Sequence, residues 1–329
     1  MCSNFNNVFS WIILLFGSAA KFRFYKTFTD YMEVPVETPD AVVASSNPYV
    51  DVNKPTYLIA IGFNFKLEGP LLTELVPALL NLGDRNVCLV NWVNEASAGI
   101  LGEGLGYALN ALPNSKTVGE AVGKGIVKLV NLGLKNDIHF IGHSLGAQLA
   151  GYAGRETIKH GINLTEIIAL DAARLGYEPP SLYQYVDKSC ATLVYAVHCD
   201  VNGYALNITL GHVDFWPNFG NYESSTSIRL QPGCLKGTTL QEILTNGNRC
   251  SHDYCYKFYV VSLTNPGLFV GSKANNYFQW KTISNVNANN TNFIGPLINP
   301  NRPGNFYFVT GSTNPWGLGA NGLQPPTTT

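Results

Sequence analysis

The stretch Phe140-Ile-Gly-His-Ser-Leu-Gly-Ala-Gln148 places a serine between two glycines, directly after a short apolar run. The apolar residues predict a strand over 138–142, and helical spacing of the apolar residues that follow predicts a helix from residue 145. A serine between glycines at such a turn is typical of a nucleophile elbow, in which the glycines leave room for the sharp bend. The helix N-terminus beneath the serine offers free N–H groups to an oxyanion. Ser144 is therefore the candidate nucleophile.

The composition is typical of a folded globular protein. Of 329 residues, 46% are apolar and only 13% are charged. So little charge argues against a disordered chain and against a nucleic-acid-binding protein. The net charge of −1 predicts no general attraction to anionic surfaces, so any binding to lipid has to depend on apolar surface.

Apolar strands and helical patterns alternate along most of the chain. The sequence predicts strands over 56–61, 86–91, 138–142, 166–170 and 193–198, and helices over 71–82, 117–132, 145–160 and 252–264. Two further strand-like runs, 277–282 and 305–310, are expected near the end. This alternation predicts an α/β protein with a mostly parallel central sheet and helices on both faces. Functional sites in such sheets form at the carboxyl ends of the strands.

The chain is expected to form one catalytic domain with short flanking segments. Residues 1–20 contain an apolar run that ends in small residues, which predicts a secretory signal peptide, with an uncleaved anchor as the alternative. Residues 21–54 are then a polar N-terminal segment, 55–312 the folded domain, and 313–329 a C-terminal tail. The protein is accordingly expected to be secreted.

Six cysteines remain once the signal peptide is removed. An even number in an exported chain suits three disulfides, although Cys88 lies in an apolar strand and is also compatible with a buried free thiol. Glycosylation sequons begin at Asn163, Asn207 and Asn289, which fits export.

A serine nucleophile needs a histidine base and a carboxylate that orients it. In the elbow architecture the acid and then the histidine follow the serine in the chain. Asp171 fits the acid because it ends the next predicted strand. His252 follows a cysteine and opens the last predicted helix, and position alone leaves His198 and His212 as rivals for the base. The remaining histidines are expected to be structural, and His143, inside the elbow, is expected to point away from the partner of Ser144.

These residues together resemble the pancreatic lipase family of secreted lipases and phospholipases, and most of all its single-domain insect-type members. The resemblance extends over about 56–310. It is carried by Ile59-Ala-Ile-Gly-Phe63, Val90-Asn-Trp92, Gly142-His-Ser-Leu-Gly-Ala147, Leu170-Asp-Ala-Ala173, Val197-His198, Gly211-His-Val-Asp-Phe-Trp-Pro-Asn218, Gln231-Pro-Gly-Cys234 and Cys250-Ser-His252.

The resemblance implies an α/β-hydrolase fold and a catalytic triad of Ser144, Asp171 and His252. It implies an oxyanion hole made by the backbone N–H groups of Phe63 and Leu145. The implied chemistry is hydrolysis of a carboxylic ester at a lipid–water interface, with a phospholipid or acylglycerol as substrate and with no metal ion or cofactor. The family's C-terminal lipid-binding domain is not found in this sequence, so no colipase partner is expected.

The resemblance also implies that Cys234 and Cys250 staple a lid. Only residues 235–249 lie between them, with Leu240, Ile243 and Leu244 available to touch lipid, and the loop from 198 to 211 is short as well. In the family, short versions of both accompany phospholipase A1 activity, which is the expected activity here. A triacylglycerol or neutral lipase is the alternative, as is a non-catalytic yolk or lipid-carrier protein.

The sequence departs from the family pattern at three positions near the site. Ile61 replaces a histidine before the oxyanion-hole glycine, Asn91 replaces an aspartate beside Trp92, and Ala172 replaces a proline after the acid. None of the three is a triad position. The departures bear on rate and substrate more than on the class of reaction.

Overall fold

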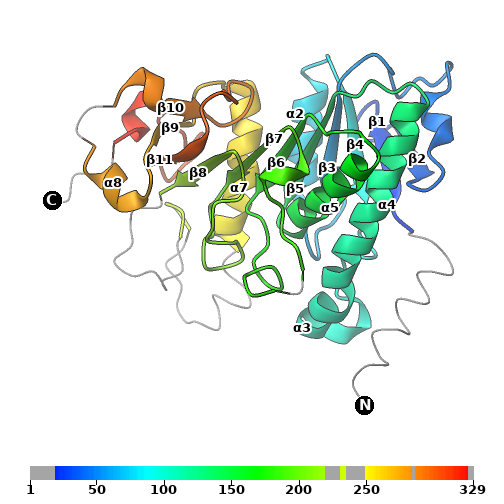
Figure 1. Ribbon diagram of the computed structural model, residues 1–329, viewed down its shortest axis with the longest axis horizontal. Helices are drawn as coiled ribbons and strands as arrows, with labels where there is room; N and C mark the ends of the chain where they lie inside the picture. Colours follow the sequence, from blue (N-terminus) through cyan, green and yellow to red (C-terminus); the bar gives the residue numbers. More distant parts are fainter. Residues whose placement is uncertain (1–18, 182, 219–229, 235–248, 284–285, 325–329) are drawn as a thin grey trace.

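Eleven strands form one sheet in the computed structural model, which describes residues 19–181, 183–218, 230–234, 249–283 and 286–324. The neighbouring strands in the middle are all parallel (Figure 1), in the order β11 (Gly304–Phe308), β8 (Val213–Pro217), β7 (Leu193–Val197), β6 (Glu166–Leu170), β5 (Ile138–His143), β3 (Thr56–Ala60) and β4 (Asn86–Asn91). The predicted parallel sheet is therefore confirmed.

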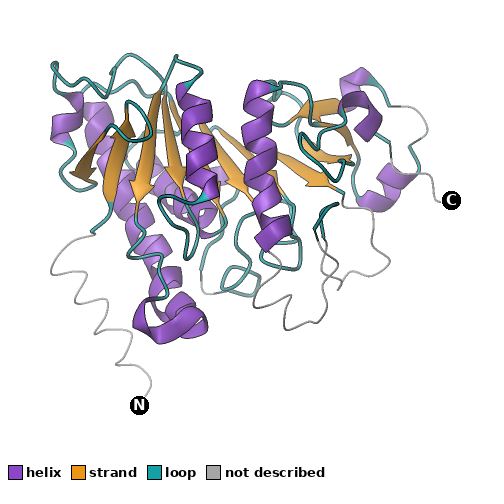
Figure 2. Ribbon diagram, turned by 180° about the vertical axis from the view of Figure 1, so that it is seen from behind, coloured by secondary structure: helices purple, strands orange, loops and turns teal. Residues whose placement is uncertain are grey.

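Helices cover both faces of this sheet. On one face α4 (Leu112–Asn131) packs against α5 (Leu145–Lys159), and on the other α2 (Pro70–Leu80) packs against α7 (Arg249–Thr264). Figures 1 and 2 show the two pairs from opposite sides. A parallel sheet between two helical layers, with a serine at a strand-to-helix turn, is the α/β-hydrolase fold that the sequence predicts.

The central strands are apolar because they are covered on both faces. Every residue of β6 and of β8 is buried, so neither strand has a polar, solvent-facing side. The strands that the sequence predicts at 56–61, 86–91, 138–142, 166–170 and 193–198 are all present, within a residue or two of these limits. Such continuous apolar runs are the clearest strand signal in an α/β protein.

The folded domain begins near residue 21 and not at residue 55, where the sequence analysis placed its boundary. Residues 21–54, expected to precede the folded domain, contribute β1 (Lys21–Tyr25) and β2 (Tyr31–Pro35) to the sheet. β1 pairs antiparallel with β4 and with β2, which closes this edge of the sheet. Phe22 and Phe24 are fully buried, so the pair belongs to the hydrophobic core.

The C-terminal region closes the other edge with short elements that the sequence did not predict. β9 (Val270–Lys273) and β10 (Thr291–Phe293) add two antiparallel strands beside β11. The strand expected over 277–282 is wrong, because α8 (Tyr277–Lys281) forms there. The side chain of Asn276 accepts a hydrogen bond from the N–H of Gln279, which caps this helix at its N-terminus.

Residues 313–324, expected as part of a tail, pack on the domain. The Trp316 ring lies 5.4 Å from the ring of Tyr254 and 6.1 Å from that of Phe258, both on α7. Single helical turns complete the fold: η1 (Asp40–Val43), η2 (Gly99–Leu101), α3 (Gly102–Gly106), η3 (Tyr107–Ala111), η4 (Lys188–Cys190), η6 (Ala288–Asn290) and η7 (Gly319–Gly322).

Three expectations fall wholly or mostly outside the described residues. They are the signal peptide, of which 1–18 are not described, the lid between Cys234 and Cys250, and the last five residues of the expected tail. Within the part of the chain that is described, no helix combines the length and the apolar character needed to cross a membrane.

Candidate active site

Ser144 occupies the sharp turn between β5 and α5. Its φ of 56° and ψ of −122° lie in a region that L-residues rarely adopt, at a cost of about 1–3 kcal/mol. A Cβ atom on Gly142 would lie 2.5 Å from the Cα of Ala147, and one on Gly146 would overlap the carbonyl oxygen of Ala60. The glycines on both sides are therefore required by close approach of the backbone. The turn holds the serine at the carboxyl edge of the sheet.

Asp171 follows β6 directly, on the strand beside the one that delivers Ser144. Its carboxylate is fully buried and accepts hydrogen bonds from the backbone N–H groups of Cys199, at 2.6 Å, and Asp200, at 3.0 Å. Its own N–H donates to the carbonyl of Val197. These bonds fix the carboxylate in one orientation and satisfy its charge.

His252 lies in the first turn of α7 and points at this carboxylate. Its Nδ1 is 2.6 Å from Oδ2 of Asp171, and both side chains are buried. A carboxylate bound to Nδ1–H fixes the tautomer that leaves Nε2 free to accept a proton. The ring of Tyr204 lies 5.2 Å from the His252 ring and covers it from the loop between β7 and β8. The arrangement is that of a base oriented by an acid.

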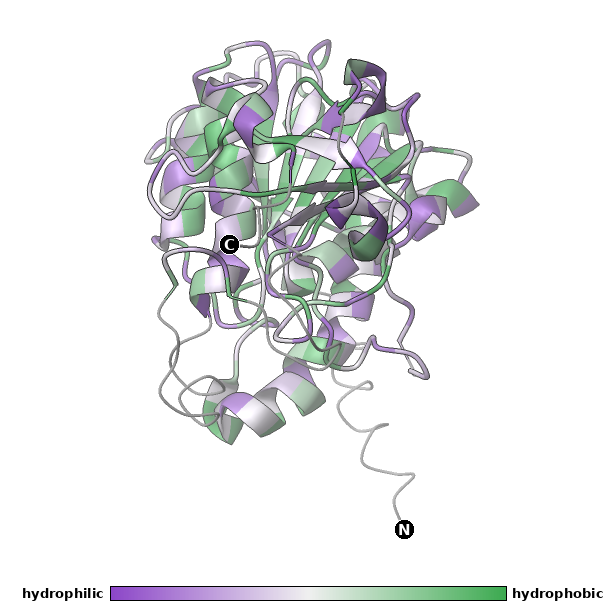
Figure 3. Ribbon diagram, turned by 90° about the vertical axis from the view of Figure 1, so that its left-hand side faces the viewer, coloured by the Kyte–Doolittle hydropathy of each residue, from purple (hydrophilic) through white to green (hydrophobic). Residues whose placement is uncertain are grey.

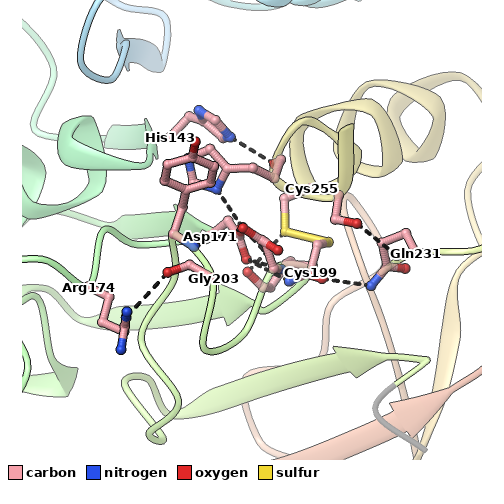
Figure 4. A network of polar contacts seen from close by, with 12 residues as sticks. His143, Asp171, Arg174, Cys199, Gly203, Gln231 and Cys255 are labelled. Atoms are coloured by element: carbon pink, nitrogen blue, oxygen red, sulfur yellow. Dashed lines mark hydrogen bonds and ion pairs between the residues drawn. A yellow bond between two sulfur atoms is a disulfide. The ribbon is translucent and has the colours of Figure 1, made fainter. Parts of the chain in front are cut away.

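His143, next to the serine, contradicts the expectation that it points away from the base. Its Nε2 donates to the backbone carbonyl of His252 at 3.0 Å, and the two rings are 4.5 Å apart (Figure 4). Burial, together with the neighbouring His252, lowers the pKa of His143 well below its usual value. His143 therefore stays neutral, with its proton on Nε2, and ties the elbow to the helix that carries His252.

Asp200 is a second buried carboxyl group that the sequence did not single out. Its Oδ2 accepts a hydrogen bond from the N–H of Tyr204 at 2.8 Å. Burial, and then the charge of Asp171, raise the pKa of Asp200 well above its usual value. A neutral carboxyl group beside an ionised one is the stable arrangement where two acids share a dry site.

Two groups of side chains here have atoms close enough to hold a metal ion. In one, Asp171 lies near Cys199 and Cys255, and in the other Asp171 and Asp200 lie near His252, with the ligand atoms of each group within 4.8 Å of one another. Neither fits a metal, because the two sulfurs are joined in a disulfide and the Asp171 oxygen is bonded to the imidazole. The arrangement suits proton transfer instead.

Phe63 and Leu145, the residues expected to form the oxyanion hole, both lie close to Ser144. Leu145 is the first residue of α5, and Phe63 follows Gly62, where a Cβ atom would lie 2.7 Å from the Cβ of Ser144. Among the described residues, neither N–H donates a hydrogen bond. Two free N–H groups beside a serine can stabilise an oxyanion.

Two of the three departures from the family pattern have a structural explanation. Ile61 is fully buried, and its carbonyl accepts a hydrogen bond from the indole N–H of Trp92 at 3.0 Å, so the segment before Phe63 is anchored without a histidine. Asn91 donates to Oε1 of Glu33, which also binds Arg23 at 2.7 Å. Glu33 thus supplies a carboxylate where the family has one at position 91.

The comparison with known families agrees with this geometry. The model of the lipase family matches residues 21–316, which is most of the chain. The chain belongs to the lipase family. The match begins at β1, in agreement with the structure and not with a domain that starts at residue 55.

Curated relatives of this lipase-family chain include active and inactive proteins. Pancreatic triacylglycerol lipase of Myocastor coypus is 31% identical over 258 residues, which cover 74% of this chain and 52% of that protein. Lipase member H-B of Xenopus laevis is 29% identical over 240 residues, covering 71% and 46%. Inactive pancreatic lipase-related protein 1 of Mus musculus is 29% identical over 265 residues, covering 76% and 51%. The chain spans about half the length of these relatives.

Likeness to solved structures is weak. Lipase B of Aspergillus fumigatus superposes with a TM-score of 0.31 and 13% identity, over 63% of this chain and 45% of that one. The fold assignment therefore rests on the sheet topology and on membership of the lipase family.

The two rival histidines have other partners. Nε2 of His198 is 2.8 Å from Oδ1 of Asp214, and its ring stacks on Trp216 at 3.8 Å. Nδ1 of His212 accepts a hydrogen bond from the N–H of Val194. The His198 ring thus packs between two side chains, and the His212 ring binds strand backbone. The only histidine bonded to Asp171 in the described part of the chain is His252.

Two disulfides, not three, are present among the described residues. Cys234 pairs with Cys250, as the family resemblance implies, and Cys199 pairs with Cys255. Cys88 and Cys190 are buried free thiols. The bond between Cys199 and Cys255 links the loop whose N–H groups hold Asp171 to the helix that carries His252 (Figure 4).

Proposed function

We propose that this chain is a secreted serine carboxylic-ester hydrolase that acts on lipids through Ser144, His252 and Asp171. The observation that carries the proposal is the 2.6 Å bond from the imidazole of His252 to Asp171 in a lipase-family chain, with Ser144 held at a strained turn beside them. The strain of the turn is consistent with function, because such backbone persists at sites where it positions a reacting group.

The proposed reaction runs in two halves. Oγ of Ser144 attacks the ester carbonyl while Nε2 of His252 takes the hydroxyl proton, and the oxyanion binds the N–H groups of Phe63 and Leu145. The alcohol leaves with the proton from His252, which gives an acyl-serine. Water, deprotonated by His252, then attacks the acyl carbon and releases the fatty acid. Each oxyanion donor contributes on the order of 3 kcal/mol to the transition state.

Phospholipase A1 activity is the proposed specificity, which releases one fatty acid from a glycerophospholipid. It is supported by the short chain between Cys234 and Cys250, which are 16 positions apart, and by the short connection between β7 and β8. A small cover leaves room for a polar head group. The 31% identity to a pancreatic triacylglycerol lipase favours the second candidate, a triacylglycerol lipase.

Secretion is part of the proposal. The apolar run within residues 1–20 suits a signal peptide, and two of the sequon asparagines, Asn163 and Asn289, are exposed and open to glycosylation. Disulfides persist in oxidising compartments, and the bonded cysteine pairs agree with export.

The test compares hydrolysis of mixed-chain phosphatidylcholine and of a triglyceride by the wild type, Ser144→Ala and the exposed-serine control Ser46→Ala. We expect Ser144→Ala to lose about six orders of magnitude in kcat, whereas the control keeps full activity. Mass spectrometry of the products then identifies the ester that is cleaved. Faster turnover of the triglyceride would replace the phospholipase assignment by the second candidate. A wild type no faster than Ser144→Ala on either lipid would leave only a non-catalytic, carrier-like role.

A further inference from the structure

A small helical lobe stands out from the carboxyl edge of the sheet. It comprises η2, α3 and η3, residues 99–111, and we call it the apolar lobe. Figure 1 shows it beyond the N-terminal end of α4, on the side of the sheet to which β5 delivers Ser144. Its base is fixed, because the amide of Asn110 donates to the carbonyl of Ser97 at 3.0 Å.

The lobe exposes large aliphatic side chains to an unusual degree. Ile100 is fully exposed, and Leu101, Leu105 and Leu109 have relative exposures of 43%, 60% and 54%. Leu105 and Leu109 are four residues apart in the helical segment formed by α3 and η3, so they lie on the same side of it. Figure 3 shows the hydropathy of this projecting segment. A contiguous exposed apolar patch of this kind is rare on a protein that has no partner for it.

The apolar patch continues toward the candidate active site. Leu175, 68% exposed, lies on the loop after β6, and its carbonyl accepts a hydrogen bond from the Tyr107 hydroxyl of the lobe at 2.8 Å. The Tyr107 ring also contacts the ring of Phe63, and the two ring centroids are 5.1 Å apart. One aromatic side chain therefore separates the exposed patch from the residue proposed to bind the oxyanion.

The chemistry of the lobe suits a lipid surface. Glu103 is the one charged residue in 99–111, and no basic residue is present, so attraction to phosphate groups cannot hold a partner there. The lobe's large aliphatic side chains are exposed to solvent. Insertion of such side chains into the boundary between head groups and acyl chains depends on apolar area alone.

We propose that the apolar lobe inserts into the surface of a zwitterionic lipid aggregate and holds the mouth of the active site against it. The proposal rests on the proposed function in one respect, that the substrate is a lipid. The lobe anchors the protein through Ile100, Leu101, Leu105 and Leu109, while Tyr107 and Leu175 join the anchor to the site.

The test measures binding without hydrolysis. The full chain carrying Ser144→Ala is sedimented with large unilamellar phosphatidylcholine vesicles, with and without the pair Leu105→Glu and Leu109→Glu. The matched control pair, Leu132→Glu and Phe278→Glu, replaces exposed apolar residues outside the lobe, which are 49% and 75% exposed. Binding is measured in a hydrolysis-deficient background, so a failure of the proposed function leaves this result unaffected.

We expect the lobe pair to weaken vesicle binding by on the order of 10-fold for each leucine, with the control pair unchanged. Raising the salt concentration is expected to leave the binding intact. Circular dichroism verifies that both variants are folded. If the two pairs bind equally well, or if vesicles fail to sediment the parent protein, the proposal is wrong.

A gain-of-signal variant covers the case in which the glutamates disturb folding. Leu105→Trp adds an exposed indole, whose emission is expected to shift to shorter wavelength when vesicles are added, relative to the parent protein. An unshifted spectrum contradicts insertion. Light scattering tests whether the patch instead binds a second copy of the chain. If the parent protein is a dimer that the glutamates dissociate, and if it does not bind vesicles, the patch is a dimer interface and the proposal is wrong.

Discussion

Replacing His252 or His198 by alanine removes a buried imidazole from a carboxylate in either case, but the consequences should differ in kind. The His252 ring is bonded to Asp171 at 2.6 Å, and the His198 ring to Asp214 at 2.8 Å. The two pairs are thus alike in geometry and burial. We expect both substitutions to destabilise the fold, but only His252→Ala to destroy catalysis.

The expected loss of stability depends on which hydrogen bonds each buried carboxylate keeps after the substitution. In His198→Ala, the hydrogen bonds left to the buried carboxylate of Asp214 among the described residues come from the N–H groups of Leu210 and Gly211. The ring stacked on Trp216 is also lost. Breaking a buried pair in this way costs about 3–5 kcal/mol in the free energy of unfolding.

In His252→Ala, the carboxylate of Asp171 likewise keeps two backbone N–H donors, so a similar loss of about 3–5 kcal/mol in the free energy of unfolding is expected. The loss of the proposed general base is expected to lower kcat by about six orders of magnitude. The ratio of the two effects, and not either one alone, separates a catalytic role from a structural one.

The assay measures kcat on a short-chain, water-soluble ester for each variant, divided by the concentration of folded protein from near-ultraviolet circular dichroism. Urea unfolding of the same samples gives the free energy of unfolding. His198→Gln serves as a milder variant that keeps a hydrogen-bonding group and remains folded. Equal losses of kcat per folded molecule in His198→Gln and His252→Ala would refute the assignment of the base.

Three further predictions concern the surroundings of the site. Gly146→Ala is expected to lower the free energy of unfolding by about 3 kcal/mol or more, because its Cβ would overlap the carbonyl of Ala60; an unchanged urea midpoint would contradict this. Asp200→Asn is expected to stabilise the fold increasingly above pH 4. Burial and Asp171 raise the pKa of Asp200, so the folded wild type holds a proton that the unfolded chain releases, and its stability falls by up to about 1.4 kcal/mol per pH unit. The gap between the unfolding curves of the two proteins is expected to widen as the pH rises above 4, until Asp200 ionises in the folded wild type. Finally, Cys88 and Cys190 are expected to react with iodoacetamide only in denaturant without reductant, and peptide mass spectrometry that finds them joined would disprove the free thiols.

The parallel core was predictable because its strands carry an unambiguous signal. A strand covered on both faces is mostly apolar, as β6 is after Glu166, and such a run followed by a helical pattern has few other interpretations. The flanking strands lack this signal. β1 reads Lys-Phe-Arg-Phe-Tyr and alternates polar with apolar residues, while β10 has only three residues. Their positions depend on pairing with distant strands, which no local pattern records.

The error over 277–282 has a local cause. The aromatic residues of Tyr-Phe-Gln-Trp suggest a strand, but Asn276 caps a helical turn and Trp280 is buried beneath it. Capping by one side chain and burial of one ring decide the structure of so short a segment. Strand propensity takes account of neither the cap nor the buried ring.

Part of the candidate site could be deduced from the chain order alone. Ser144 and Asp171 end neighbouring strands, so the topology brings them together once the elbow is recognised. Asp200 and the role of His143 could not be found in this way. Both depend on contacts across the loop after β7 and the first turn of α7, which form only when distant segments are packed.

The bond between Cys199 and Cys255 makes the proposed activity conditional on the compartment in which the chain matures. Cys199 donates its N–H to the acid, and Cys255 lies one helical turn beyond the imidazole. Neither cysteine lies in a strand of the sheet. Reduction would therefore leave the hydrophobic core intact, while it removes the covalent link between the loop that binds Asp171 and the helix that carries His252. Protein produced in a reducing cytosol should therefore be well folded by far-ultraviolet spectroscopy yet slow. The yield of competent enzyme should follow the oxidative step of maturation and not the folding of the sheet.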